Sequence, residues 1–200
     1  MAQKRFKQLT MEELTPEQRP LGEAIMKVSS LGIQGPYNPL LRSPKLGQLM
    51  YDLLYYIRWN SSLPNRLTEM AILMIGRQWS SNVEWFAHEP IARKAGLGED
   101  IIAALKANKR PAAMQPDEDA LYDFINELFN QYRVSDATFA KAKSVFTEQQ
   151  LVDLTATGGT STASLTGQVT LPAALAGPLG VPATLDGDAG TLTARMPQSR

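Results

Sequence analysis

The residues best suited to chemistry lie in the stretch SSNVEWFAHEP, residues 80–90. It contains the only histidine of the chain, His88, within the spacing Ser81-x-x-Glu84-x-x-x-His88. Residues three, four and seven apart lie on one side of an α-helix, so these three side chains would share a face. A glutamate beside an imidazole raises the histidine pKa and orients the ring, which suits a general acid or base near neutral pH.

The same residues also have purely structural interpretations. Ser81 and Glu84 match a capping box, in which the serine begins a helix and the glutamate reaches back to the serine amide. His88 could be a buried histidine satisfied by a neighbour, or an exposed one. The spacing leaves catalysis and capping both open.

A third candidate lies on the preceding segment, where Glu69 is the one acidic residue in the apolar stretch LTEMAILMIG. If the chain turns near Ser80 to form an αα-hairpin, Glu69 lies about 16 Å and His88 about 12 Å from the turn, at 1.5 Å per residue. The two side chains would then face each other at similar heights. The alternative is a surface glutamate favoured in the first turn by the helix dipole.

The elements that position these residues are predicted to be helices. Apolar residues recur at helical spacing in residues 43–59 and 67–75, and residues 115–133 form an amphipathic pattern. No segment shows strand alternation, and the glycine- and threonine-rich residues 155–171 are predicted to be helical. We expect an all-α, single-domain helical bundle of seven or eight helices over residues 1–185, with its core motif at 60–110 and an irregular tail at 186–200. The residues expected to form one buried face of the 43–59 helix are Leu46, Leu49, Met50, Leu53, Leu54 and Ile57.

The composition excludes several classes of function. Twenty basic and 20 acidic residues balance, which gives no electrostatic case for nucleic acid or an anionic membrane. Cysteine is absent, which excludes disulfides and thiolate nucleophiles, and a single histidine argues against a protein-only metal site. With neither a secretory signal nor a membrane-spanning stretch, we expect a cytoplasmic protein that needs no metal or other cofactor.

Residues 67–105 resemble the core of the alkylhydroperoxidase D / carboxymuconolactone decarboxylase superfamily. The matching marks are Glu69, the motif Glu84-Trp85-x-x-His88 and the AxxxGL motif at 92–97, and weaker similarity covers residues 20–155. The resemblance implies an all-helical fold of the alkylhydroperoxidase D-like type that assembles into dimers, trimers or hexamers.

The resemblance also separates the branches of the superfamily. The peroxidase branch carries Cys-x-x-Cys-x-x-x-His, and alignment on His88 puts those cysteines at Ser81 and Glu84, with the supporting glutamate at Glu69. A hydroxyl and a carboxylate cannot form a disulfide, so peroxidase activity is disfavoured. The decarboxylase branch has glutamate and histidine at the Glu84 and His88 places and is the nearer match. The chain after Thr155 departs from the family pattern, which leaves the substrate open.

We therefore expect a cofactor-independent, decarboxylase-like lyase that acts on a carboxylated or lactone-like ring. His88 would be the proton donor or base, Glu84 would share the proton traffic or hold the ring, and Glu69 would orient His88 or raise its pKa. The alternative is a non-catalytic oligomeric protein that binds a ligand or serves as a scaffold.

The expected substrate-binding residues flank this set. Ser81 would donate to an oxyanion, Trp79 and Trp85 would wall an apolar pocket, and Arg77, or else Arg42, would bind a carboxylate. A homo-oligomer is expected, in part because the small residues of 155–180 allow close helix approach.

Overall fold

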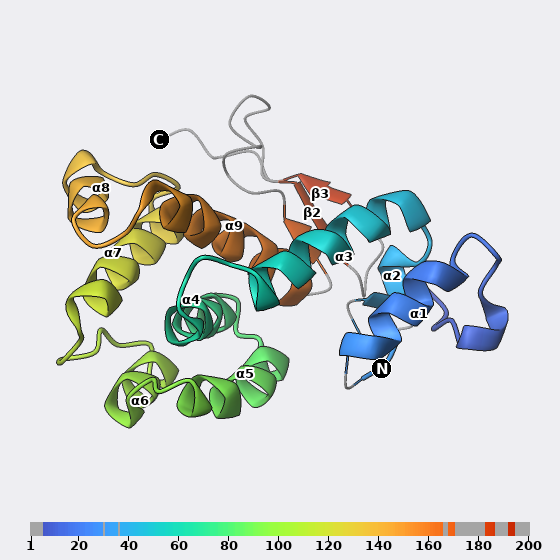
Figure 1. Ribbon diagram of the computed structural model, residues 1–200, viewed down its shortest axis with the longest axis horizontal. Helices are drawn as coiled ribbons and strands as arrows, with labels where there is room; N and C mark the ends of the chain where they lie inside the picture. Colours follow the sequence, from blue (N-terminus) through green and yellow to red (C-terminus); the bar gives the residue numbers. More distant parts are fainter. Residues whose placement is uncertain are drawn as a thin grey trace.

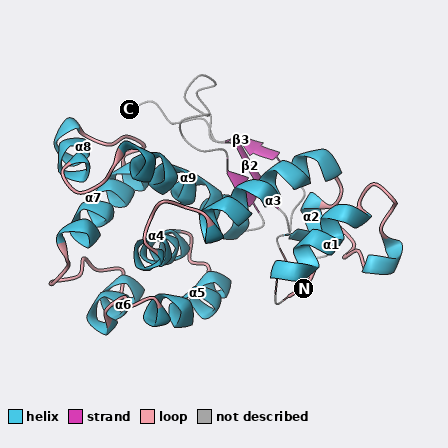
Figure 2. Ribbon diagram, in the orientation of Figure 1, coloured by secondary structure: helices cyan, strands magenta, loops and turns pink. Residues whose placement is uncertain are grey.

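The computed structural model describes residues 6–29, 31–35, 37–165, 168–170, 183–186 and 192–194; of residue 83 and of residues from 160 onward it describes the backbone alone. The described part is helical in its body, with three short strands at one edge, as Figure 2 shows. A 3₁₀ turn occupies Met11–Glu13. The helices are α1 (Arg19–Val28), α2 (Tyr37–Leu40), α3 (Pro44–Trp59), α4 (Asn65–Gln78), α5 (Asn82–Lys94), α6 (Glu99–Lys106), α7 (Pro116–Asn130), α8 (Asp136–Lys143) and α9 (Glu148–Leu165).

Helix α4 is the centre of the larger group of helices. Nine of its 14 residues are buried, so it is enclosed on nearly every side rather than along one stripe. Figure 1 shows it almost end-on, with α5 and α6 below it, α9 above it and α7 and α8 to one side. A large apolar core surrounds it, and the prediction for 115–133 is confirmed, because Leu121, Phe124 and Ile125 of α7 are part of this core.

A second, smaller group is formed by α1, α2 and the first half of α3. Its core contains Leu21, Ile25 and Leu41. The buried side chain of Asn38 ties it together, since its amide donates to the carbonyls of Leu9 and Ile33 at 3.0 Å. Helix α3 runs from this group to the larger one (Figure 1), so its C-terminal end reaches the vicinity of α5 and α9.

The predicted buried face of α3 is largely wrong. Of its six residues only Ile57 is buried, whereas Leu46, Leu49 and Leu53 are 50, 68 and 39% exposed. The helical period correctly identified an apolar face, but periodicity does not say which element covers it.

The C-terminal region differs in part from the helical prediction for 155–171. Helix α9 ends at Leu165, and β1 (Gln168–Thr170), β2 (Ala183–Asp186) and β3 (Leu192–Ala194) form an antiparallel sheet in the order β1-β2-β3. Strands of three or four residues are too short to show alternation in a sequence. Residues 166, 167 and 171 of that prediction lie outside the described residues, as does most of the predicted tail 186–200, although β3 falls within it.

Asp153 of α9 fastens the segment between α3 and α4. Its buried carboxylate accepts the N–H and O–H of Ser62, at 2.8 and 2.7 Å, and the hydroxyls of Ser61 and Tyr56, at 3.4 and 3.3 Å. Burial opposes ionisation, but these hydrogen bonds outweigh it and lower the pKa of Asp153. The contacts hold the end of α3 and the start of α4 in place.

We expect Asp153→Ala to lower the free energy of unfolding by about 1–3 kcal/mol, because it leaves buried donors without an acceptor. Urea denaturation at neutral pH measures the change. The control is Asp52→Ala on the exposed side of α3, where a surface change should stay within about 0.5 kcal/mol. An equal effect of the two substitutions would contradict the role assigned to Asp153.

Candidate active site

The turn between α4 and α5 brings the predicted residues together. Ser80 has a left-handed backbone with φ of 55°, and the N–H groups of Ser80 and Ser81 donate to the carbonyls of Arg77 and Gly76, at 3.1 and 2.8 Å. These two bonds form a Schellman-type end to α4, with a serine where glycine is usual. The predicted αα-hairpin is confirmed, and its turn is at Ser80.

The two helices of the hairpin approach closely at Gly76. A Cβ atom placed there would lie 3.3 Å from the Cβ of Glu84 and 3.6 Å from the ring of Trp85. A side chain at position 76 would therefore push α5 away from α4. The close approach puts the first turns of α5 against α4, which the Glu69–His88 contact requires.

The imidazole of His88 lies between two carboxylates. Its Nδ1 is 2.6 Å from Oε2 of Glu69, and its Nε2 is 3.1 Å from Oε2 of Glu84. Glu69 is 1% exposed and His88 is 6% exposed, so the closer contact is shielded from water. The structure therefore assembles the three residues predicted as catalytic, at hydrogen-bonding distances.

The electrostatics of the site favour protonated His88. Burial lowers the pKa of the His88 imidazole, but hydrogen bonds and charge from Glu69 and Glu84 outweigh burial, and the net pKa is raised. Because an ionised carboxylate can only accept, Nδ1 carries a proton when Glu69 is ionised. Nε2 is then the nitrogen that can release or take up a proton.

Two further residues near the site were not predicted from the sequence. Nη1 of Arg58, on the last turn of α3, lies 3.4 Å from Nε2 of His88. Tyr37 of α2 is close enough to interact electrostatically with Arg58 and Glu84. The pKa of its phenol is raised, mainly by burial, because the charge of Arg58 lowers it and that of Glu84 raises it. The site thus lies where α5 meets α2 and α3, at the junction of the two groups of helices.

The predicted substrate-binding residues do not all gather at this site. Ser81 is the N-cap residue of α5, and its carbonyl accepts the N–H of Trp85 at 3.3 Å. Trp85 is buried in the main core, whereas Trp79, at the end of α4, is 40% exposed. Arg77 lines a pocket between α4, α6 and α7 rather than contacting His88 in any described interaction. Arg42 binds the backbone carbonyls of Lys7 and Asn38 in the smaller group of helices.

The acidic side chains and the histidine of the described residues do not gather into a metal site. No group of three or more His, Asp or Glu side chains there has an arrangement suited to a metal ion. Glu69, His88 and Glu84 are instead engaged with one another. Similarly, no helix among the described residues combines the length and apolar character needed to cross a membrane.

Two solved structures share this arrangement of helices. One is a protein of unknown function from Agrobacterium tumefaciens, suggested to be the antioxidant defence protein AhpD: it has a TM-score of 0.56 and 17% identity, over 65% of this chain and 90% of that chain. The other is the alkylhydroperoxidase AhpD core of an uncharacterised peroxidase-related protein from Ralstonia eutropha, with a TM-score of 0.64 and 15% identity, over 87% of this chain and 88% of that chain. The chain has an AhpD-like fold.

The AhpD-like fold confirms the resemblance found in the sequence at the level of the fold. No protein-family model matches the sequence, and no curated protein matches it either. The identity to the two AhpD-like structures is too low to transfer an activity, so the chemistry has to be argued from the residues of this chain.

The raised pKa of His88 can be measured directly, because the chain has a single histidine and one imidazole Cε1–H signal. We expect its titration midpoint to lie above about 6.5, the ordinary value for histidine. Glu69→Gln should lower the midpoint, since it replaces the nearer carboxylate with a neutral amide. The matched control is Glu89→Gln, also on α5, whose carboxylate pairs with Arg93 and Lys106 instead. A midpoint that is the same in wild type and Glu69→Gln would refute the pairing.

The same shift makes stability depend on pH. A histidine whose pKa is raised on folding stabilises the native state fully below its unfolded pKa of about 6.5, and the contribution is lost as pH rises through the folded value. The difference in unfolding free energy between wild type and His88→Gln should therefore shrink as the pH is raised from about 6 to about 9. Urea denaturation across that range measures it; a difference that grows with pH would show that the sign is wrong.

Proposed function

We propose that the chain is a cofactor-independent enzyme that performs acid/base chemistry, of the decarboxylase or lactone type, on a carboxylated or lactone-like ring. The observation that carries the proposal is the buried imidazole of His88 between Glu69 and Glu84. A buried titratable group whose pKa is shifted by a specific charged partner is typical of functional sites. The AhpD-like fold is consistent with the proposal without specifying the reaction.

In this proposal His88 acts through Nε2 and Glu69 acts through His88. Glu69 fixes the ring and the proton on Nδ1, as the buried carboxylate of a hydrolytic triad does for its histidine. The raised pKa widens the pH range in which Nε2 carries a proton, which favours the role of proton donor. Decarboxylation releases CO₂ and leaves a carbanion or enolate that must receive such a proton. Nε2 then regains a proton from water, and the carboxylate of Glu84, beside Nε2, can relay it.

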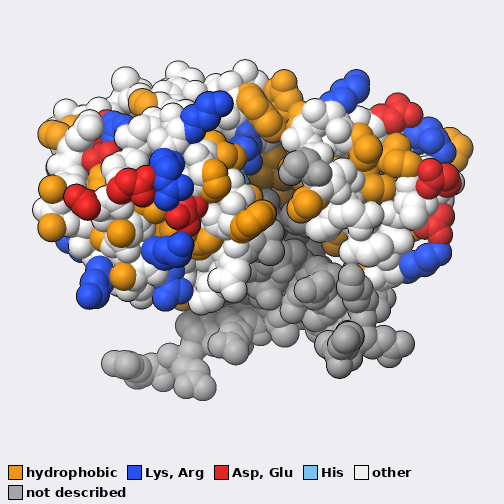
Figure 3. Space-filling model, turned by 90° about the horizontal axis from the view of Figure 1, so that it is seen from below, with side chains coloured by type: hydrophobic (Ala, Val, Ile, Leu, Met, Phe, Trp, Pro, Cys, Tyr) orange, Lys and Arg blue, Asp and Glu red, His pale blue; other side chains and the backbone are white. Residues whose placement is uncertain are grey.

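Arg58 is the proposed anchor for the substrate carboxylate. Its guanidinium lies beside Nε2 of His88 and can offer paired N–H donors to a carboxylate. Arg58 thus replaces Arg77, or else Arg42, as the residue proposed to bind a substrate carboxylate. Figure 3 shows a hollow with hydrophobic side chains along it between the two groups of helices, and we assign it as the path by which a ring-shaped substrate reaches the site.

A thiol peroxidase reaction is not available to this chain, whatever the activity of its structural neighbours. Reduction of a peroxide through a disulfide needs two thiols, and the sequence has no cysteine. A cytoplasmic location and assembly into a homo-oligomer remain predictions.

The second candidate is a non-catalytic protein that binds a ligand or serves as a scaffold. One observation favours it: a pocket lies at Arg77, away from the proposed catalytic residues, and His88 is not among its lining residues. The contacts of Nε2 with Glu84 and Arg58 would then be structural.

The decisive experiment measures turnover on a panel of lactones and carboxylated aromatic acids. On the best substrate we expect His88→Gln to lower kcat by about 10²–10⁴-fold, the usual worth of a general acid or base. Glu89→Gln, whose carboxylate lies outside the site, should leave it unchanged. Full turnover by His88→Gln would sink the catalytic proposal, and binding of panel members without turnover would favour the second candidate.

Arg58 has a separate test. Arg58→Gln should raise KM for carboxylated substrates by about 10-fold or more, the loss expected for a charge-assisted contact, with little effect on uncharged lactones. The same loss for charged and uncharged substrates would mean that Arg58 supports the site rather than binding a carboxylate.

A further inference from the structure

A second polar site lies on another side of α4 from His88. The ends of α4 and α6 and the second half of α7 line a half-open pocket of about 40 Å³. Since one water needs about 10–15 Å³, this space suits a few waters or one small polar ligand. Its apolar lining includes Ile75, Ile125 and Phe129, and its polar lining includes Arg77, Lys109 and Asn126.

The Nε atom of Arg77 is the unusual feature of this pocket. It is buried, and it meets no acceptor among the described residues. Buried donors are nearly always paired, because an unpaired one loses its hydrogen bond to water without compensation. Two other buried side-chain atoms in the described part of the chain share this condition, on Gln8 and Trp85, but neither residue lines the pocket.

The charge of the pocket is positive. Arg77 and Lys109 line it, and no acidic side chain is among its described lining residues. The C-terminal ends of α4 and α6 each contribute about half a negative charge, which together is less than two full cations. The balance favours an anionic ligand.

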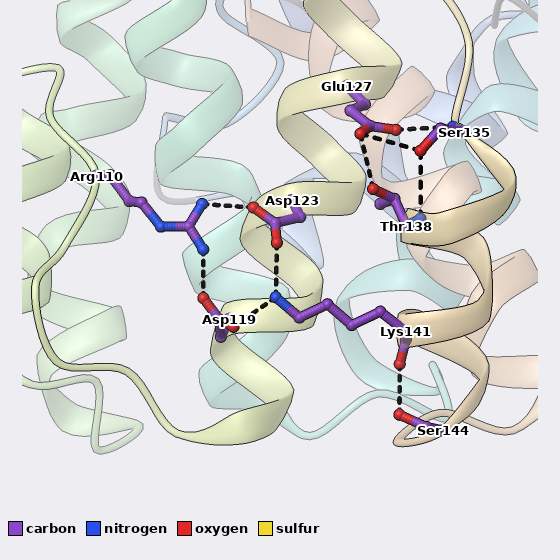
Figure 4. Close-up of polar contacts among 8 residues, drawn as sticks. All are labelled: Arg110, Asp119, Asp123, Glu127, Ser135, Thr138, Lys141 and Ser144. Atoms are coloured by element: carbon purple, nitrogen blue, oxygen red, sulfur yellow. Dashed lines mark hydrogen bonds and ion pairs between the residues drawn. The ribbon is translucent and has the colours of Figure 1, made fainter.

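Neighbouring acids are already neutralised by other cations. Figure 4 shows Arg110 bound to Asp119 and Asp123, and Lys141 bound to the same two carboxylates. These contacts also hold the side chain of Arg110 against α7, and Arg110 is the next residue after Lys109. Asp119 and Asp123 are therefore not available to Arg77, and the segment that carries Lys109 is held at the pocket.

Amide groups complete the polar lining. Nε2 of Gln78 donates to Oδ1 of Asn130 at 3.2 Å, and Nδ2 of Asn130 donates to Oδ1 of Asn126 at 2.9 Å. This chain of bonds orders the three amides and leaves the Nδ2 group of Asn126, at its end, as a further donor beside the pocket.

We propose that this pocket binds a small oxyanion, either an inorganic phosphate-like ion or a carboxylate, through the guanidinium of Arg77 with support from Lys109. The proposal does not depend on the chemistry assigned to His88, because none of the residues of that site lines this pocket. The size of the pocket limits the ligand to a group of a few heavy atoms, which can be the head of a longer molecule.

The test follows the Nε–Hε signals of arginine by NMR while inorganic phosphate or, separately, acetate is added at constant ionic strength. We expect the Arg77 signal to shift saturably with at least one of the two anions, and the anion that saturates identifies the source. In the variants, binding is followed through the side-chain amide signals of Asn126, which also lines the pocket, because Arg77→Gln has no Arg77 signal. Arg77→Gln should weaken the binding by about 10-fold or more, since it removes a charge-assisted donor. Arg133→Gln is the control, an exposed arginine outside the pocket with the same change of charge.

Lys109→Gln provides a second variant at an exposed position, so its folding should be intact. It should weaken binding less than Arg77→Gln and more than Arg133→Gln. Absence of saturable binding, or equal weakening by Arg77→Gln and Arg133→Gln, would overturn the proposal.

Discussion

The hydrogen bond between Glu69 and His88 is the constraint on which the rest of the site depends. A carboxylate at the centre of an apolar core is costly unless a charged or hydrogen-bonding partner meets it. Glu69 is 1% exposed, and the imidazole nitrogen at 2.6 Å is that partner. To deliver it, the chain must reverse within a few residues and pack α5 tightly on α4. The left-handed turn at Ser80 and the side-chain-free surface at Gly76 meet these two requirements.

The core of the site could be predicted from the sequence because its geometry is local. Glu69 and His88 are 19 residues apart, on two helices joined by one short turn, so the rise per residue fixes their relative heights. Arg58 and Tyr37 could not be found in this way. Their approach depends on where α3 crosses the hairpin and where α2 packs on α3, and neither crossing leaves a periodic signal in the sequence.

Helix α3 shows where periodicity stops being informative. Its spacing correctly predicts an apolar face, yet of the six residues of that face only Ile57 is buried. Tyr51, Tyr55 and Trp59 stack along the same helix, with ring centroids 6.0 and 4.8 Å apart. A pattern reports that a face is apolar, whereas burial depends on the neighbour that covers it. The expected homo-oligomer would offer such a neighbour. Because the same helix carries Arg58, a second subunit that covered α3 would also act on the position of Arg58 beside His88.

Each charged residue on a helix as enclosed as α4 needs a partner of its own. Arg66, near its start, is paired with Asp117 and Glu118 of α7, and Glu69 is paired with His88. Arg77, near its end, has a buried Nε with no acceptor in the described part of the chain. The first two pairings show that this core satisfies even its charged groups. By the same rule the unpaired donor at Arg77 calls for an acceptor, and the cationic pocket that it lines is where an acceptor can bind.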